Sequence, residues 1–291
     1  NQNVIFTMGH KSIAEHAFFN FDIMGLSRRA VEELEKKRLQ SYTEKSQRYI
    51  TLHGDFVIPS EIRGRPLEGE FVQLIERQNK FYNDNLNTLI SWHIKQNPEV
   101  DLTIKKNMER IEGYGKEDAR YGLAMATQAQ IGLSLSARNL ESLITELRSS
   151  EAEEVRNLGE KLLNEVNGIA PSVIKYTRPT EYYLKTRKEL REHVSELLEK
   201  KKEYLAHCSS HPILGQNIIS SENITLAAGF RRDESIPAGI IFSSSNIPFI
   251  KCLKLAASHH FSDEEKMELL KKADAHQEKH DPKLREYELG D

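Results

Sequence analysis

The stretch from Gly9 to Tyr49 concentrates the side chains that could bind phosphate groups. It holds two histidines, eight lysines or arginines and four serines around one short apolar run. Clustered cations and hydroxyl groups are well suited to bind phosphate oxygens. The whole chain carries a net charge of -3, so an anion site must be local, and a general affinity for nucleic acid is not expected.

Two expected elements would position these side chains. Residues 17–24 alternate apolar and polar side chains, and this period of two predicts a half-buried strand that Gly25 ends. Ser27 can then cap a helix, because apolar residues recur after it at helical spacing. The apolar positions of this helix are Ala30, Val31 and Leu34. Its polar end carries Lys36, Lys37 and Arg38.

The rest of the chain predicts mostly helices. Before the prolines at 171 and 179, the expected elements are a long amphipathic helix over 68–96, a charged helix near 103–112, a helix over 116–127, a strand over 128–136, and helices over 137–148 and 151–166. After those prolines, they are a charged helix over 181–206, short strands in ITLAAG and AGIIFSSS, and helices over 248–258 and 263–275.

Composition places the chain among soluble globular proteins. It has 291 residues, of which 38% are hydrophobic and 29% charged, and no run long enough to span a membrane. Cys208 and Cys252 match no metal spacing and suggest no disulfide framework, so we expect a reduced, cytoplasmic setting. The chain begins at Asn1 without an initiator Met, and we expect a segment to precede it.

Each candidate residue also has a purely structural interpretation. The histidines at 10 and 16 could cap and pack at the entrance of the strand, and the EKKR run could be a solvated helix end. Arg120 and Arg138 could form surface ion pairs. His259 and His260 have no third residue placed to complete a metal site, so no metal is expected.

The order and spacing of these residues resemble the flavin-dependent thymidylate synthases over roughly residues 1–175. The opening segment of that family, Gly-His-x-Ser/Thr-x-x-Glu-His, is matched by Gly9, His10, Ser12, Glu15 and His16. The Ser-Arg that opens its helix, and the end of its signature, are matched by Ser27, Arg28, Glu44, Ser46, Arg48 and Tyr49. Its second block is matched by Ala119-Arg120, Ser136-Ala137-Arg138 and Leu147-Arg148.

The chain departs from the family pattern at the centre of the signature. Lys36, Lys37 and Arg38 stand where the family has Arg-His-Arg, and Glu33 replaces the usual Gln. Lys is not equivalent to Arg at a bidentate contact. Ser136 replaces an Asn, and Arg148 is displaced by one residue.

The resemblance implies an α+β fold, with an antiparallel or mixed sheet packed with long helices, and the methylation of dUMP to dTMP. Methylenetetrahydrofolate would supply the carbon, and FAD reduced by NADPH would supply the hydride. The implied catalytic residues are Arg148, Ser46 and His10, with Arg148 stabilising negative charge on the uracil. The implied flavin-binding residues are Ser12, Lys36, Lys37, Arg38, Glu44, Ser136, Arg138 and Ser142. The implied dUMP-binding residues are Glu33, Lys36, Glu44, Ser46, Arg48, Arg120 and Arg148. The family builds its sites between the subunits of a tetramer.

The last third of the chain resembles the opening of a second copy of the same fold. His280 would stand for His10, and Glu286 would fall near the position of His16. The expected organisation is a first repeat over 1–178, a connecting helix over 179–212, and an incomplete second repeat over 213–291, cut before its signature. Two further interpretations stay open: a degenerate, non-catalytic repeat that structurally completes the site of a catalytic partner domain, and a flavin- or nucleotide-binding sensor.

Overall fold

The computed structural model describes residues 11–208, 218–220, 225–227, 231–278 and 281–290. The chain divides into two compact units, Asn1–Arg178 and Pro179–Asp291. The first unit is α+β and the second is mainly helical in its described part.

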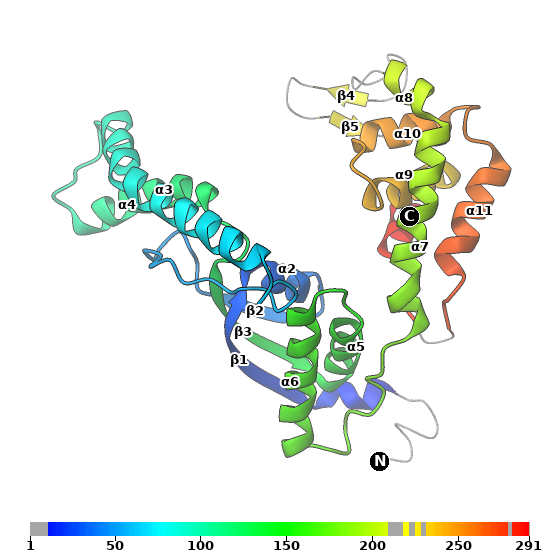
Figure 1. The fold of residues 1–291 in the computed structure, drawn as a ribbon, viewed down its shortest axis with the longest axis horizontal. Coiled ribbons are helices and arrows are strands. Elements are labelled where there is room, and N and C mark those ends of the chain that lie inside the picture. The colour runs from blue at the N-terminus through cyan, green and yellow to red at the C-terminus, as the bar shows by residue number, and fades with distance from the viewer. Residues whose placement is uncertain (1–10, 209–217, 221–224, 228–230, 279–280, 291) are drawn as a thin grey trace. The chain divides into compact units, whose positions relative to one another are not determined.

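The first unit is built around a three-stranded antiparallel sheet with the strand order β1-β3-β2 (Figure 1). The strands are β1 (Phe18–Ser27), β2 (Ser41–Glu44) and β3 (Gln128–Ser136). Ile131, Leu133 and Leu135 of β3 are buried on one face, which confirms the strand expected from their alternation. The last of the three strands along the chain therefore occupies the centre of the sheet.

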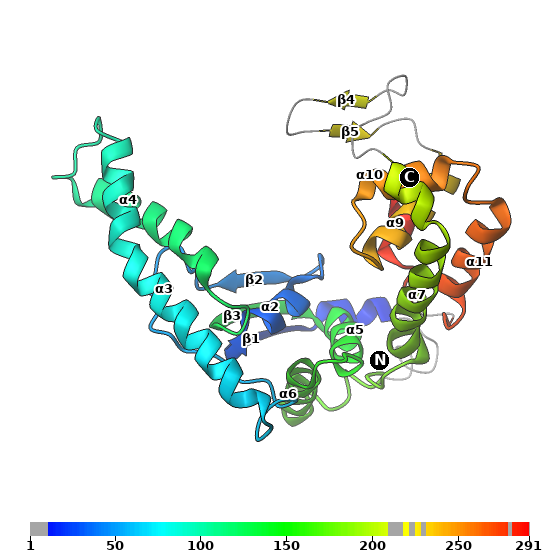
Figure 2. The same ribbon diagram turned by 45° about the horizontal axis from the view of Figure 1, so that its top comes forward.

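Helices cover the apolar face of this sheet. The three helices in its core are α2 (Arg28–Glu35), α5 (Ala137–Arg148) and α6 (Glu153–Ile169), and Figure 2 shows α5 and α6 on one side of the sheet. A short 3₁₀ helix, η1 (Lys11–His16), precedes β1. Ser27 caps α2 as expected, because its Oγ accepts the N–H of Ala30 at 3.1 Å. The Glu154 carboxylate of α6 accepts both the N–H and the hydroxyl of Ser27, each at 2.7 Å.

Gly25 does not end the first strand, contrary to expectation. Strand β1 continues to Ser27, and its pairing with β3 shifts register between Met24 and Leu26. Gly25 has a φ of +79°, which is the left-handed region that glycine occupies easily. It therefore forms a bulge within the strand instead of a terminus.

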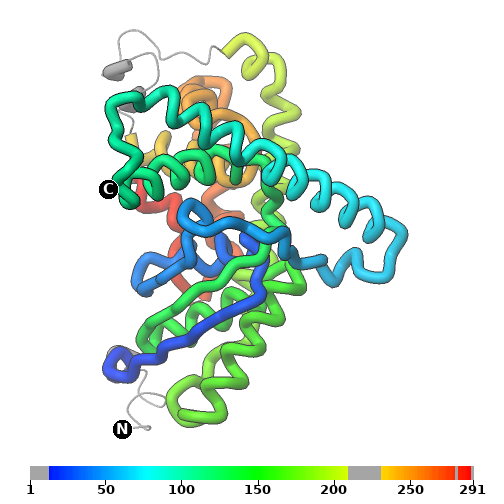
Figure 3. Tube along the Cα trace, turned by 90° about the vertical axis from the view of Figure 1, so that its left-hand side faces the viewer, coloured from blue at the N-terminus to red at the C-terminus, as the bar shows by residue number. Residues whose placement is uncertain are grey.

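A helical hairpin is inserted between β2 and β3. It consists of α3 (Leu67–Gln96), which confirms the long helix expected over 68–96, and α4 (Lys105–Ala119). The two helices approach closely, since a Cβ on Gly115 would lie 2.5 Å from the Ile90 Cγ1. In Figures 1 and 3 the hairpin, drawn in cyan and green, extends away from the sheet of its own unit.

The prediction of a helix over 116–127 is wrong. Helix α4 ends at Ala119, η2 (Arg120–Gly122) follows, and Met125 is half exposed. The backbone carbonyls of residues 125–127 instead accept N–H groups of Arg29, Val57 and Arg28 at 2.9–3.0 Å. Pairing with distant segments thus satisfies backbone groups that a local helix would otherwise have used.

The second unit has its own hydrophobic core. Its elements are α7 (Glu181–Lys200), α8 (Lys202–His207), β4 (Ile218–Ser220), β5 (Thr225–Ala227), α9 (Arg232–Ser243), α10 (Phe249–Ala257), α11 (Asp263–Asp274) and the 3₁₀ helix η3 (Arg285–Gly290). Tyr182, Leu190 and Val194 of α7 are buried in this core. The helix expected as a connection is therefore packed into the second unit.

AGIIFSSS was expected to be a strand, and this is wrong for residues 238–243, which belong to α9. A short apolar run does not distinguish a buried strand from a buried helix. Ile240 and Ile241 are fully buried although they are adjacent in sequence, so the helix is covered on several sides. The start of the helix is stabilised because the Glu234 carboxylate accepts the Arg231 N–H at 2.9 Å.

Glu286 fixes η3 to α7 in the second unit. Its carboxylate accepts two hydrogen bonds from the Arg187 guanidinium, at 2.7 and 3.1 Å. Burial raises the pKa of Glu286, but the hydrogen bonds from Arg187 and Ser243 outweigh this and hold the pKa below its ordinary value. His280, its expected companion, lies outside the described residues.

No helix in the described part of the chain is long and apolar enough to cross a membrane. Within the same residues, no group of three or more His, Cys, Asp or Glu side chains could hold a metal ion.

Candidate active site

Helix α5 carries the predicted residues of the second sequence block. Ser136 is its N-cap, and the Ser136 Oγ accepts the N–H of Asn139 at 3.4 Å. Arg138 follows in the first turn and forms an ion pair with Glu15 of η1 at 2.5 Å. Ser142 lies one turn further on the exposed face and donates its hydroxyl to the Arg138 carbonyl at 3.5 Å. Arg138 and Ser142 therefore share one face of the helix.

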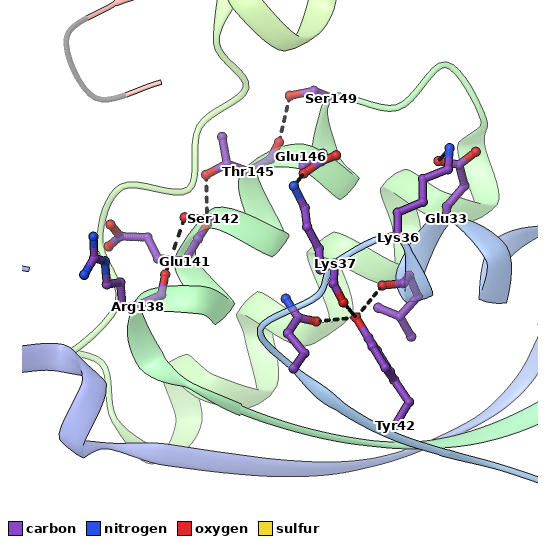
Figure 4. A network of polar contacts seen from close by, with 12 residues as sticks. Glu33, Lys36, Lys37, Tyr42, Arg138, Glu141, Ser142, Thr145, Glu146 and Ser149 are labelled. Carbon is purple, nitrogen blue, oxygen red and sulfur yellow. Dashed lines mark hydrogen bonds and ion pairs between the residues drawn. The ribbon is translucent and has the colours of Figure 1, made fainter. Parts of the chain in front are cut away.

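The three cations that follow α2 have different environments. The Lys36 Nζ lies 2.7 Å from the carboxylate of Glu33, three residues earlier in the last turn of α2. Lys37 reaches across to α5 and forms an ion pair with Glu146 (Figure 4). Arg38 is exposed and has no hydrogen-bond or ion-pair partner among the described residues. Two of the three cations are thus already neutralised within the chain.

Two side chains hold the loop that carries these cations: Tyr42 of β2 fixes it to the end of α2, and Asn139 fixes it to α5. The Tyr42 hydroxyl lies 2.8 Å from the Leu34 carbonyl oxygen and 3.2 Å from that of Lys37. The Asn139 side-chain amide donates to the Leu39 carbonyl at 2.7 Å. Burial raises the pKa of Tyr42 to about 12, with a further contribution from the nearby carboxylates of Glu35 and Glu146.

Glu44, at the end of β2, is engaged by Arg28. Their ion pair measures 2.5 Å, and the same guanidinium also lies 2.6 Å from Glu32. Beyond it, Ser46 shapes a turn, because its Oγ accepts the Arg48 N–H at 3.3 Å. The final residues of the sequence signature therefore form a strand end followed by a turn.

Glu117 of α4 brings two predicted arginines together. Arg48 lies 3.4 Å and Arg120 3.9 Å from the same Glu117 Oε1. Residues separated by more than seventy positions thus meet at one carboxylate, and two positive charges share one negative charge. This group retains a net positive charge.

Arg148 is held within its own unit. Its Nε donates to Glu160 of α6 at 2.7 Å, and its NH1 donates to the Thr177 carbonyl at 2.6 Å. Gly159 makes room for this arrangement, since a Cβ there would lie 2.8 Å from the Arg148 Cγ. The Arg148 guanidinium is bound to α6 and to the segment that ends the unit.

Most of the predicted residues therefore fall into three groups: the α2–α5 group around Lys37 and Glu146, the Arg48–Arg120 group, and Arg148 with Glu160 and Thr177. Glu44 is paired with Arg28, and Ser46 forms the turn before Arg48. His10 and the side chain of Ser12 lie outside the described residues. The sequence interpretation missed the acidic partners Glu117, Glu146 and Glu160. Glu117 and Glu146 each had a local signal, because Glu117 precedes Arg120 by three residues and Glu146 follows Ser142 by four within the expected helices.

A sequence model described as "Thymidylate synthase complementing protein" matches residues 2–172. The chain belongs to this family. The chain is 32% identical over 183 residues to a flavin-dependent thymidylate synthase of Clostridium tetani, covering 61% of this chain and 70% of the relative. It is 30% identical over 180 residues to the enzyme of Geobacter sulfurreducens, covering 60% and 67%. For the enzyme of Thermococcus kodakarensis the identity is 32% over 180 residues, covering 58% and 63%.

Membership of the thymidylate synthase complementing protein family implies a flavin, and the first unit offers donors of a suitable type. Ser142 and Arg138 are exposed on α5, where Arg138 is paired with the exposed Glu15 through one of its nitrogens, and Arg38 is exposed on the adjacent loop. Guanidinium and hydroxyl groups are suitable donors to a flavin diphosphate. Lys37 is also of the right type, but its charge is taken up by Glu146.

Proposed function

We propose that this chain acts in thymidylate synthesis, the methylation of dUMP to dTMP with methylenetetrahydrofolate as carbon donor and FAD reduced by NADPH. The family match over residues 2–172 carries the proposal. The grouping of Arg48 and Arg120 on Glu117 supports it, because two cations sharing one carboxylate leave positive charge for a nucleotide phosphate.

The residues would divide the work by their chemistry. FAD, when bound, supplies the hydride. Arg38, Arg138 and Ser142 would hold its phosphates through charge-assisted hydrogen bonds. Arg48 and Arg120 would bind the dUMP phosphate. The substrate sites would be completed between subunits of a homo-oligomer, either a tetramer or a dimer of double-repeat chains, acting in the cytoplasm without nucleic acid or a membrane as partner.

A second candidate function is a non-catalytic repeat that completes the site of a catalytic partner domain. The engagement of Arg148 by Glu160 and Thr177 favours it, because this guanidinium would have to leave both partners to reach a uracil ring. In this proposal the second unit is the start of a second repeat. The flavin- or nucleotide-binding sensor remains a third proposal.

Two assays on the purified protein separate these functions. The enzyme proposal expects bound FAD that is released on denaturation, and release of tritium from C5-labelled dUMP in the presence of NADPH, FAD and methylenetetrahydrofolate. FAD binding without tritium release would favour the sensor or the non-catalytic repeat. A protein that binds no FAD and releases no tritium would contradict both the enzyme and a flavin sensor.

Arg120→Gln provides the internal control for substrate binding. It removes one cation of the Arg48–Arg120 group, so we expect about a tenfold or greater rise in KM for dUMP with FAD binding unchanged. Equal loss of FAD and dUMP binding would instead place Arg120 in the flavin site.

A further inference from the structure

Glu146 continues the row of predicted flavin-binding residues along α5. Arg138, Ser142 and Glu146 are spaced by four residues, so they lie one above another on the same face of the helix. The Glu146 side chain is about one-third exposed, at 34%. Figure 4 shows Ser142 and Glu146 on the same helix, with Lys37 approaching Glu146 from the neighbouring loop. The Glu146 carboxylate therefore lies on the same helix face as Arg138 and Ser142, whose side chains are hydrogen-bond donors.

The position of Lys37 is fixed by contacts of its own loop. Its carbonyl oxygen lies 3.2 Å from the Tyr42 hydroxyl, and the carbonyl of Leu39 accepts the Asn139 amide at 2.7 Å. The Asn139 contact holds the loop close to α5, and the Tyr42 contact fixes it to β2, so the Lys37 ammonium lies within reach of Glu146. The Lys37–Glu146 ion pair therefore joins side chains whose backbones are held close together by the fold.

The pair changes the charge that an arriving anion would meet. The Lys36–Glu33 and Lys37–Glu146 pairs are each neutral, which leaves Arg38 as the uncompensated cation of the three. A phosphate that approaches Lys37 must displace the Glu146 carboxylate and then lie beside its negative charge. The raised pKa of Tyr42, due first to burial and then to Glu35 and Glu146, agrees with a negative potential at this place.

We propose that Glu146 is an internal anion that competes with phosphate groups for Lys37 and so lowers the affinity of the first unit for diphosphate ligands such as FAD. The identity of the ligand rests on the proposed function. The competition itself rests on the ion pair and applies equally to inorganic pyrophosphate.

The test compares Glu146→Gln with Glu165→Gln in the full chain. Glu165 is exposed on α6, and its side chain forms no hydrogen bond or ion pair with the described residues. Both variants remove one negative charge. We expect Glu146→Gln to bind FAD and pyrophosphate about 5- to 10-fold more tightly than the wild type at low salt, because one like charge beside the ligand is removed. Glu165→Gln should bind both as the wild type does. Isothermal titration calorimetry measures the two affinities.

Further variants separate the mechanism from a folding effect. Adding Lys37→Met to Glu146→Gln should abolish the gain, since the gain requires the freed ammonium. Glu146→Ala should change the affinity in the same direction as Glu146→Gln.

The outcomes also separate this inference from the proposed function. Tighter pyrophosphate binding by Glu146→Gln, without FAD binding by any variant, would support the competition and contradict the flavin function. FAD binding that is equal in wild type, Glu146→Gln and Glu165→Gln would overturn the competition and leave the flavin function standing. A gain that persists with Lys37→Met would also overturn it.

Discussion

At the scale of single residues, the acidic partners decide what the predicted cations can do. Lys37 and Arg148 are both candidate ligand-binding residues, yet each is bound by a carboxylate of its own unit. Arg38 is exposed, and the Arg48–Arg120 group shares only one carboxylate. The cationic side chains therefore differ in how much charge they can offer to a phosphate, although the sequence presents them alike.

Arg148 should contribute to stability. We expect Arg148→Met to lower the free energy of unfolding by about 1–3 kcal/mol, because it removes hydrogen bonds to a carboxylate and to the carbonyl of buried Thr177. Arg138→Met is the matched control. Its ion pair with Glu15 is about half exposed on both sides, so the loss should be at most about 0.5 kcal/mol. Urea denaturation measures the free energy of unfolding of both variants. Equal decreases in the two variants would mean that the contacts of Arg148 do not stabilise the fold more than a surface ion pair does.

At the scale of elements, close helix packing explains how α5 presents its residues. Gly159 lets α6 approach α5 at the point where Leu147 and Arg148 lie, since a Cβ there would be 3.0 Å from the Leu147 Cβ and 2.8 Å from the Arg148 Cγ. The backbone NH of Arg148 would be 3.1 Å away. A backbone atom cannot give way as a flexible side chain can, so this glycine sets the distance between the two helices.

Two glycines of α6 give a sharp test of this packing. We expect Gly159→Ala to destabilise the protein by about 1–3 kcal/mol through overpacking. Gly168→Ala should be neutral or stabilising by up to about 1 kcal/mol, because its Cβ would meet no atom within 4 Å and alanine favours a helix. Thermal unfolding followed by circular dichroism compares the two. A stable Gly159→Ala protein would show that α5 and α6 can separate without cost.

The sequence was sufficient for elements whose periodicity was strong. The alternation of Ile131, Leu133 and Leu135 predicted β3, and Ser27 was recognised as a helix cap. The sequence was insufficient where a segment far away in the chain determines the local backbone conformation. Residues 125–127 form a turn and a bridge instead of a helix because they pair with residues 28, 29 and 57. Gly25 forms a bulge because β1 continues its pairing with β3 beyond it. The same limit hid the ion pair between Arg48 and Glu117, which lie 69 residues apart.

At the scale of the whole molecule, the α3–α4 hairpin exposes apolar side chains. Leu67, Leu74 and Phe81 recur every seven residues on α3, and each is about half exposed. Such a stripe is typical of a helix that packs against another surface. It supports the proposal of a homo-oligomer.

Leu74→Glu tests whether this stripe lies in a subunit interface. We expect the variant to dissociate at concentrations at least tenfold higher than the wild type, because a charge would have to be buried on association. Gln73→Glu adds the same charge at the neighbouring exposed position and should leave association unchanged. Sedimentation velocity measures the oligomeric state. Unchanged association of Leu74→Glu would place the interface elsewhere.

The strand order β1-β3-β2 has a consequence for synthesis on the ribosome. Strands β1 and β2 are made first, but they are not neighbours, and each pairs only with β3. Until residues 128–136 emerge, both strands lack the partner that joins them, whereas the α3–α4 hairpin can form from local contacts alone. In the nascent chain, strands β1 and β2 therefore stay unpaired while the α3–α4 hairpin is already folded. A translational pause before residue 128 would prolong the time during which their apolar side chains are exposed and can aggregate.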